Sequence, residues 1–518
     1  MSINNDDITP SNVSQTDNEI RELTINEDLQ EEKQNNLNKH FGVLYGIGMN
    51  VNTIIGSGIV TTPGIIWNMV KSPVVVLSLW FICGIVSMAG TLSYVELGVI
   101  HKISGGETKY LQTAYPHPKI MMSYLFSFMY IFAIQPGIIS AVLQSAAQYF
   151  WYTLNGHQYN EGIKDTNKTG WELPFTPFWS IKLLAITFLL IITAYHMFNT
   201  RLAVIINHTL AVIKLITYSI IAMAGIYRLI VYWPISRINW QNSLNGNSDI
   251  TAYSASILLI MFSYSGYNSL NYSLSEVRKL EKKLIISNST SIGIVILVYL
   301  LVNIAFISVV PANDILDSDI SSDETIAVIF FSKLFGKSDV TIRIFTALIA
   351  LSIIGTAATG VWNGTKVIVA AAGLNYFPKY SKELRTLNDK YNTLVNALLM
   401  HYWIFYFATG IGLLKIRHKN SDRSSKKEYQ VPSLLLGIFI LAGLIILTFS
   451  FIVHVECPKK NPHCSDEYLR KQRIEQMSPI LISYAFLFIA LLFWYFFYYW
   501  WNTLKKQKES IIRISTDK

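Results

Sequence analysis

The sequence predicts an all-α polytopic membrane protein whose first and sixth spanning helices are interrupted halfway. Hydrophobic residues make up 51% of the 518 residues and charged residues only 14%, whereas about a quarter of the residues of a soluble domain are charged. Apolar stretches long enough to cross a bilayer recur from residue 41 almost to the C-terminus. Two of these stretches carry glycine and polar residues at mid-depth, where an unbroken helix would gain nothing from them.

The apolar stretches define the expected spans and their orientation. They lie at about 41–67, 74–99, 120–153, 180–198, 201–232, 254–275, 285–310, 340–373, 392–416, 433–455 and 479–502. Basic residues gather in the loops after the second, sixth and eighth stretches, and acidic residues fill the loop 311–324. Because basic residues mark cytoplasmic loops, we expect a cytosolic N-terminus.

The two ends of the chain are expected to lie outside the membrane domain. Residues 1–40 are polar and nearly free of aromatic residues, which predicts a disordered cytosolic tail. No apolar signal-peptide core follows Met1. The membrane domain is therefore expected over residues 41–502, followed by a short C-terminal tail over 503–518.

Charge and motifs argue against several classes of function. The net charge of +9 is spread over short loops between spans, so it does not indicate nucleic-acid binding. No residues have metal-ligand spacing, and there is no nucleophile–base motif or phosphate loop. We therefore predict no metal, no cofactor and no enzymatic activity.

The first span contains a predicted break within Ile54-Ile55-Gly56-Ser57-Gly58-Ile59-Val60-Thr61-Thr62-Pro63. Two glycines permit non-helical backbone, and Pro63 can open a new helical segment. The break would free backbone N–H groups, which the membrane tolerates only beside protein or a water-filled cavity. Such groups at the start of a half-helix suit a carboxylate. The alternative is a small-residue seam for a neighbouring helix, since Gly42/Gly46 and Thr53/Ser57 are suitably spaced.

The sixth span contains the second predicted break. Its aliphatic first half changes into Phe262-Ser263-Tyr264-Ser265-Gly266-Tyr267-Asn268, which is too polar to face lipid. Gly266 is the natural break point, and carbonyl groups freed before it would suit an ammonium group. Interrupted helices five spans apart are typical of transporters built from an inverted repeat. Together the two breaks would bind both ends of an α-amino acid.

Several motifs in separate parts of the chain carry a family resemblance. They are Ile55–Ile59 with Thr62-Pro63, Tyr94–Gly98, Ser104–Leu111, Phe262–Asn268 with Glu276, and Gly355–Pro378. They resemble the amino acid–polyamine–organocation superfamily, in its L-type amino acid transporter branch, and especially the fungal methionine-permease-like proteins. The resemblance covers about residues 41–450. It implies a five-plus-five inverted-repeat fold with two further C-terminal helices.

The resemblance also implies the residues of a substrate site. The substrate carboxylate would be held by Ile55, Gly56, Ser57, Gly58 and Ile59. Phe262, Ser263 and Tyr264 would supply carbonyl groups for the amine, and Phe262 would act as an aromatic gate. The side-chain pocket would be bordered by Ser265, Gly266 and Tyr267, of which Ser265 and Tyr267 replace a frequent Gly and Trp.

Lys214 is a lysine inside the fifth span with no charged residue near it in sequence. A lysine at the bilayer centre costs about 2.5–3.5 kcal/mol on insertion scales, so it needs a partner or a purpose. Its ammonium could replace a sodium ion, and the family resemblance favours this sodium-independent role. Two interpretations stand: a coupling residue that exchanges a proton, or a structural cation neutralised by backbone carbonyls.

The C-terminal third contains an irregularity and a cysteine pair. Residues 392–416 are one crossing long, yet basic clusters flank both ends, which violates the orientation rule. Either the stretch enters and leaves on the same side of the membrane, or a span is missing. The family resemblance implies the second, the loss of about one span, roughly thirty residues at 1.5 Å each, near 400–403. In the loop 456–478, Cys457 and Cys464 form either a disulfide in an oxidising compartment or two free thiols.

The sequence therefore predicts a secondary active transporter of neutral L-amino acids, including methionine, in the plasma membrane. Proton coupling without sodium is expected, because one charge moving through 100 mV gains about 2.3 kcal/mol. An amino acid exchanger and a non-transporting amino acid receptor are the alternatives. The expected partners are the substrate and the lipid bilayer. The outer loop 154–179 has no cysteine, so no covalent glycoprotein subunit is expected.

Overall fold

The computed structural model describes residues 42–155, 177–376, 402–420, 429–449 and 484–496, with Glu467 and Arg470. Short gaps inside these ranges fall at 117, 119–120, 199, 241–243, 245, 278–279, 317–325, 337–338 and 375. The predicted tails 1–40 and 503–518, the two cysteines Cys457 and Cys464, and the irregular junction at 400–401 lie outside the described residues.

Every long regular element of the described ranges is a helix. In chain order these are α2 (Val43–Ile54), α3 (Gly58–Val70), α4 (Pro73–His101), α5 (Glu107–Ala114), α6 (Met121–Met129), η1 (Tyr130–Ile134), α7 (Gln135–Asn155), α8 (Pro177–Phe198), α9 (Thr200–Val231), α10 (Trp233–Trp240), α11 (Ile250–Ser263), η3 (Ser269–Glu276), α12 (Leu280–Val309), α13 (Ala312–Leu316), α14 (Ile326–Phe335), α15 (Asp339–Gly373), α17 (Tyr402–Asn420) and α18 (Ser433–Phe449).

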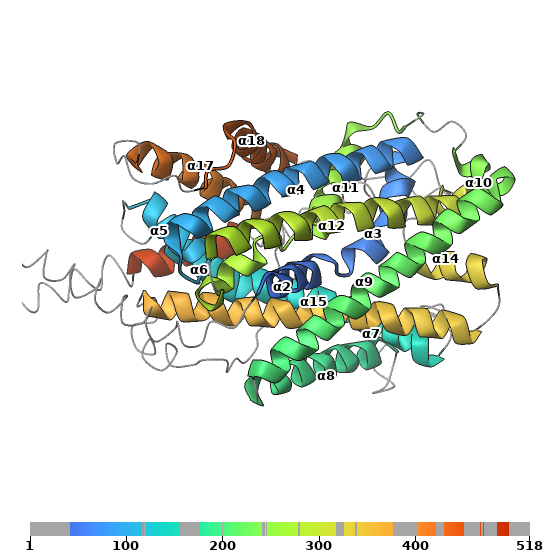
Figure 1. Cartoon of the computed structure of the whole chain (residues 1–518), viewed down its shortest axis with the longest axis horizontal. Coiled ribbons are helices and arrows are strands. Elements are labelled where there is room, and N and C mark those ends of the chain that lie inside the picture. Colours follow the sequence, from blue (N-terminus) through green and yellow to red (C-terminus); the bar gives the residue numbers. More distant parts are fainter. Residues whose placement is uncertain are drawn as a thin grey trace, which may run out of the picture.

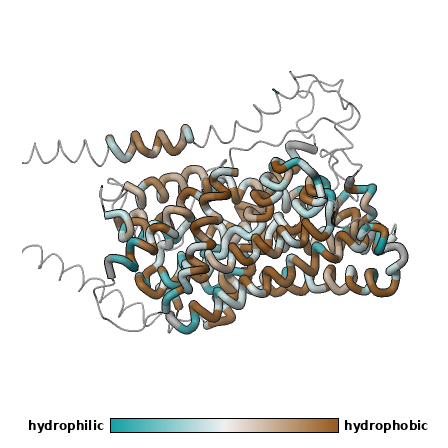
Figure 2. Tube along the Cα trace, turned by 90° about the horizontal axis from the view of Figure 1, so that it is seen from above, coloured by the Kyte–Doolittle hydropathy of each residue, from teal (hydrophilic) through white to brown (hydrophobic). Residues whose placement is uncertain are grey.

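The long helices form one bundle around the short helices α2 and α3. α12 packs against α4, α9 and α2, while α15 packs against α7 and α9 (Figure 1). Hydrophobic residues cover most of the bundle's middle, and hydrophilic residues gather towards its two ends (Figure 2). This distribution is the one that a bilayer imposes on a helical protein.

Six helices are long and apolar enough to cross a membrane, and the bent pair α2–α3 makes a possible seventh among the described residues. The six correspond to the expected spans at 74–99, 120–153, 180–198, 201–232, 285–310 and 340–373. The expected sixth span is shorter than predicted, because its helix α11 ends at Ser263. The apolar helices α18 and Tyr484–Trp494 are also shorter than the spans predicted there.

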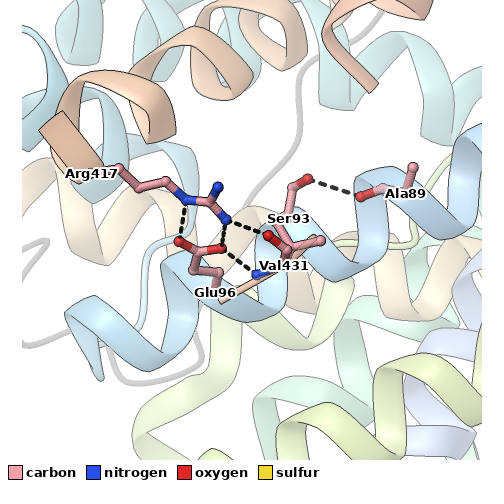
Figure 3. Close-up of polar contacts among 5 residues, drawn as sticks. All are labelled: Ala89, Ser93, Glu96, Arg417 and Val431. Carbon is pink, nitrogen blue, oxygen red and sulfur yellow. Dashed lines mark hydrogen bonds and ion pairs between the residues drawn. The ribbon is translucent and has the colours of Figure 1, made fainter. Parts of the chain in front are cut away.

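A buried ion pair joins the end of α4 to α17. Arg417 Nε donates to Glu96 Oε1 at 2.7 Å, and the second carboxylate oxygen of Glu96 accepts from the Arg417 guanidinium and from the Val431 N–H (Figure 3). Arg417 also donates to the Val431 carbonyl at 2.6 Å. Both charged groups are thereby hydrogen-bonded, which a buried pair requires. These contacts fix α17 and the start of the α18 segment on α4.

Candidate functional site

The first span breaks at residues 55–57, as the sequence predicts. α2 ends at Ile54 and α3 begins at Gly58, and the two helices meet at an angle of 45°. The backbone bonds that open α3 run from the N–H groups of Val60 and Thr61 to the Ser57 carbonyl. The N–H groups of Gly58 and Ile59 precede these bonds and have no acceptor within the helix. The positive end of α3 therefore starts in the middle of the bundle.

The second break follows α11. A turn over residues 264–268 separates α11 from the 3₁₀ helix η3. Gly266 has a φ of +101°, and a Cβ there would lie 2.6 Å from the Thr53 side chain. A side chain at position 266 would therefore be strained and would collide with α2. Glycine lets the two broken helices approach each other.

Side chains satisfy several carbonyl groups that the two breaks release. The Tyr299 hydroxyl is within hydrogen-bond distance of the carbonyls of Ile54, at 2.9 Å, and Ser263, at 2.8 Å. The Thr356 hydroxyl similarly approaches the carbonyls of Asn52 and Ile55, each at 2.9 Å. Both side chains thus join an interrupted segment to a continuous helix, which replaces part of the lost helical bonding.

A cavity of about 70 Å³, measured for the centres of water molecules, lies between the two breaks. Its lining comprises Thr53, Ile54, Gly56, Ser57, Gly58, Tyr130, Gln135, Ile138, Val142, Phe262, Ser263, Ser265, Gly266, Asn268, Tyr272, Thr356, Gly360 and Asn363. None of these side chains carries a formal charge.

The structure brings most of the predicted site residues to this cavity. Gly56, Ser57, Gly58, Phe262, Ser263, Ser265 and Gly266 line it. Ile55, Ile59, Tyr264 and Tyr267 are fully buried and are not part of its lining.

Tyr267 was predicted to border the side-chain pocket, but in the structure it does not line the cavity. Its ring packs against Tyr94, Tyr406 and Phe439, at centroid distances of 5.2–6.4 Å. The turn after Gly266 directs position 267 away from the cavity and towards α4, α17 and α18. Tyr264 likewise faces α4, where its hydroxyl donates to the Trp80 carbonyl at 3.2 Å.

Two further elements line the cavity that sequence reasoning did not identify. One is the π-helical turn η1, which supplies Tyr130 and leads directly into Gln135, the first residue of α7. Pro136 lacks the N–H that would bond the Phe132 carbonyl, and such a loss perturbs the helix. The preceding N–H, that of Gln135, donates to the Tyr130 carbonyl, which is the wider bonding pattern of a π-helical turn. The presence of Pro136 within an apolar span was the feature of the sequence that could have indicated this irregular turn.

α15 supplies the other unforeseen wall, with Thr356, Gly360 and Asn363. The Asn363 amide donates to Ser269 Oγ at 2.6 Å, and Ser269 contacts the Thr53 hydroxyl at 2.9 Å. α15 is thus connected to both broken helices. Asn363 belongs to the motif Gly355–Pro378. Because this motif is far from the first break in sequence, the sequence alone did not indicate that the two lie side by side.

Lys214 lies at the first break and is fully buried. Its Nζ donates to the Asn52 carbonyl at 2.7 Å and to the Thr356 hydroxyl at 3.0 Å. Among the described residues, the ion pairs do not include Lys214. A cation is thereby held by oxygen dipoles at the end of α2, where the helix dipole is negative.

Cys83 in α4 is a buried free cysteine. Within the described parts of the chain, no group of three or more His, Cys, Asp or Glu residues could hold a metal ion.

Apolar helices of membrane-spanning length, with a cavity between two interrupted helices, define the class as a multi-pass membrane protein with a central cavity. The amino acid permease family matches residues 41–502. The chain belongs to this family. It is therefore a membrane permease of the amino acid–polyamine–organocation superfamily and not an enzyme.

Curated relatives agree with this assignment. The chain is 26% identical to the b(0,+)-type amino acid transporter 1 of Mus musculus, over 80% of this chain and 83% of the relative. It is 24% identical to the high-affinity methionine permease of Saccharomyces cerevisiae, over 82% and 74%. It is 23% identical to the cystine/glutamate transporter of Homo sapiens, over 80% of each chain.

Proposed function

We propose that this permease is a secondary active transporter of neutral L-amino acids, with methionine among its substrates. The observation that carries the proposal is the cavity bordered at once by the start of α3 and the end of α11. The N–H groups of the Gly56–Ile59 segment would bind the substrate carboxylate. The carbonyls of Phe262, Ser263 and Tyr264 would accept from its ammonium group, Ser263 with the lone pair that Tyr299 leaves open.

The cavity wall supports a neutral side chain. Ile138, Val142 and Phe262 supply apolar surface, and the described lining carries no formal charge. A charged side chain would enter without a countercharge and lose its hydration. The name of the yeast relative, a methionine permease, supports an apolar thioether side chain. Ser265 and Gly266 would border that side chain, with Phe262 as the gate.

Lys214 supports sodium independence. Its ammonium group already donates hydrogen bonds to the Asn52 carbonyl and the Thr356 hydroxyl at the first break. A sodium ion in the same place would meet an immobile positive charge. Transport would then be driven by protons, with the chain in the plasma membrane, its N-terminus in the cytosol and no covalent glycoprotein subunit. We also propose the five-plus-five inverted repeat as its architecture.

Uptake of radiolabelled methionine into proteoliposomes tests the proposal. A pH gradient that is acidic outside should drive accumulation above equilibrium, and replacing external sodium with choline should change nothing. Uptake that requires internal amino acid and ignores the gradient would identify an exchanger. Binding without flux would identify a receptor. Absence of both binding and uptake for every amino acid would refute the proposal.

A further inference from the structure

Glu107 is a fully buried carboxylate beside the cavity, and the proposed transport has given it no role. It begins α5 directly after Gly105 and Gly106. Its Oε1 accepts from the Tyr94 hydroxyl at 2.7 Å and from Asn268 Nδ2 at 2.5 Å. Its Oε2 is buried and has no hydrogen-bond partner in the part of the chain that the structure describes. A buried carboxyl oxygen without a partner is costly when ionised and is a natural position for a proton.

One hydrogen bond separates this carboxylate from the cavity. Asn268, which donates to Glu107, is part of the cavity lining and belongs to the turn of the second break. Tyr272, the next polar lining residue along η3, lies 3.1 Å from the same Asn268 amide nitrogen. The Tyr406 hydroxyl of α17 donates to Asn268 Oδ1 at 3.1 Å. Asn268 is thus held between Glu107 and the substrate space.

The other acids near this end of the bundle have cationic partners. Glu96 pairs with Arg417, and Glu276 pairs with Lys366 at 2.6 Å. Glu107 has no ion pair among the described residues.

The titratable groups that face Glu107 are hydroxyls. They are Tyr94 of α4, Tyr110 of α5 itself, Tyr272 of η3 and, through Asn268, Tyr406 of α17. α6 presents the hydroxyls of Ser123 and Ser127 to neighbouring Thr108.

Nearby bases have other contacts. The His101 ring lies against Tyr110 at 5.1 Å, and Lys415 lies over the Tyr115 ring at 4.1 Å. Lys109, two residues further along α5, is half-buried and forms no ion pair with Glu107 among the described residues. Burial therefore raises the pKa of Glu107 above its usual range, although the hydrogen bonds from Tyr94, Tyr272 and Asn268 oppose the shift.

We propose that Glu107 is the proton-binding site that couples the proton gradient to amino acid movement, an inference that rests on the proposed transport. The carboxylate takes a proton from water on the acidic side and returns it to water on the other side. On binding, an O–H bond of a hydronium ion breaks as the carboxyl O–H bond forms. On release, the carboxyl O–H bond breaks and the proton forms an O–H bond with a water molecule. Lys214 then remains a structural cation throughout the cycle.

The geometry indicates how the proton changes the cavity. An ionised Glu107 makes charge-assisted bonds to Asn268 and Tyr94, which are about twice as strong as neutral ones. These bonds hold the second break against α4 and α5. Protonation weakens them and so favours a different position of the turn that lines the cavity. The substrate and the proton thereby both shift the conformational equilibrium of the same element, the turn of the second break.

Glu107→Gln tests the inference, because glutamine keeps the shape and cannot bind the proton. We expect methionine counterflow without a pH gradient to stay within about twofold of the unchanged chain. An inward gradient of one pH unit permits about tenfold accumulation with one proton per substrate. This accumulation, and the proton influx that a trapped pH dye reports, should both be lost. Glu276→Gln is the matched control and should retain both.

Glu107→Asp provides a second variant, because it keeps a titratable group at the same place. We expect it to retain gradient-driven accumulation with a displaced pH profile. Accumulation by Glu107→Gln equal to that of the unchanged chain would overturn the inference. Counterflow without any gradient-driven accumulation in the unchanged chain would also overturn it. Absence of counterflow in the unchanged chain would instead refute the proposed transport itself.

Discussion

Gly58 of the first broken helix lies directly against Ser263 of the second. A Cβ at position 58 would lie 2.8 Å from the Ser263 Cα, which is a backbone atom and cannot turn aside. Gly56 is less constrained, because the nearest atoms to its added Cβ belong to the Thr356 side chain, at 3.0 Å and beyond. The two glycines of the motif therefore differ: one permits contact between backbones, and the other opens space in the cavity.

Gly58→Ala should abolish methionine binding and transport, because α3 and α11 must separate to admit the methyl group. A ligand-induced rise in melting temperature measures the binding. Gly293→Ala in α12 is the control, since nothing lies within 4 Å of its added Cβ. There the helix should gain up to about 1 kcal/mol. Normal binding by Gly58→Ala would contradict the close contact.

Lys214→Ser should remove the fixed cation and leave the oxygen dipoles of Asn52 and Thr356 facing each other. We expect uptake in choline medium to fall by at least about tenfold, the effect of 1.4 kcal/mol. Sodium should restore part of it, because the ion can take the vacated place. Uptake by the unchanged chain should be equal in sodium and choline. A variant that sodium leaves unaffected would show that this position does not select a cation.

At the scale of elements, the π-helical turn η1 helps to form the cavity wall, and the α4–α17 ion pair holds one end of the bundle together. η1 directs Tyr130 and Gln135 towards the breaks, and Gln135 donates to the Gly360 carbonyl of α15. π-turns inside α-helices often occur at functional sites. The ion pair acts at one end of the bundle, where it fixes α17 and α18 beside α4.

Pro136→Ala should shift the side chains of η1. The alanine N–H can bond the Phe132 carbonyl, so the segment can continue as a regular α-helix. Gln135 would then lose its present position beside α15. We expect a rise in the KM for methionine of about twofold to tenfold, corresponding to one hydrogen bond. Uptake kinetics in proteoliposomes measure this change, and an unchanged KM would show that the π-turn does not shape the cavity.

Glu96→Gln should destabilise the bundle, because Arg417 keeps its charge and loses its countercharge. Breaking one partner of a buried pair costs about 3–5 kcal/mol. Thermal unfolding of the purified protein in detergent measures the loss. Combining it with Arg417→Met should recover part of the stability, since no unpaired charge then remains. Equal losses in the single and double variants would contradict a specific pair.

At the scale of the whole molecule, local sequence signals predicted the elements better than their partners. The breaks at Gly56–Gly58 and Gly266 follow from glycine and polar residues inside apolar runs, which are visible in a short window. The position predicted for Tyr267 was wrong because the direction of its side chain depends on the φ of +101° at Gly266. Asn363 and Gln135 were missed because their approach to the cavity depends on how α15 and α7 pack.

Orientation in the membrane is also a property of the whole molecule. Lys282 lies in the first turn of α12 and Asn313 lies in α13, just beyond the other end of α12, and both are exposed. Single cysteines at these positions, in a chain without Cys83, Cys457 and Cys464, should react differently with an impermeant maleimide. We expect Asn313→Cys to be labelled on intact cells and Lys282→Cys only after permeabilisation. The reverse pattern would place the N-terminus outside.

The Lys214 ammonium has a consequence for the electrical behaviour of the permease. It is covalently part of the chain, so it never dissociates on either side of the membrane. For the proposed sodium-independent transport, a concentration difference of a dissolved metal cation would therefore perform no work through this position. For the proposed symport, a zwitterion accompanied by one proton would carry one elementary charge, so current and methionine flux should stand in a ratio of one to one.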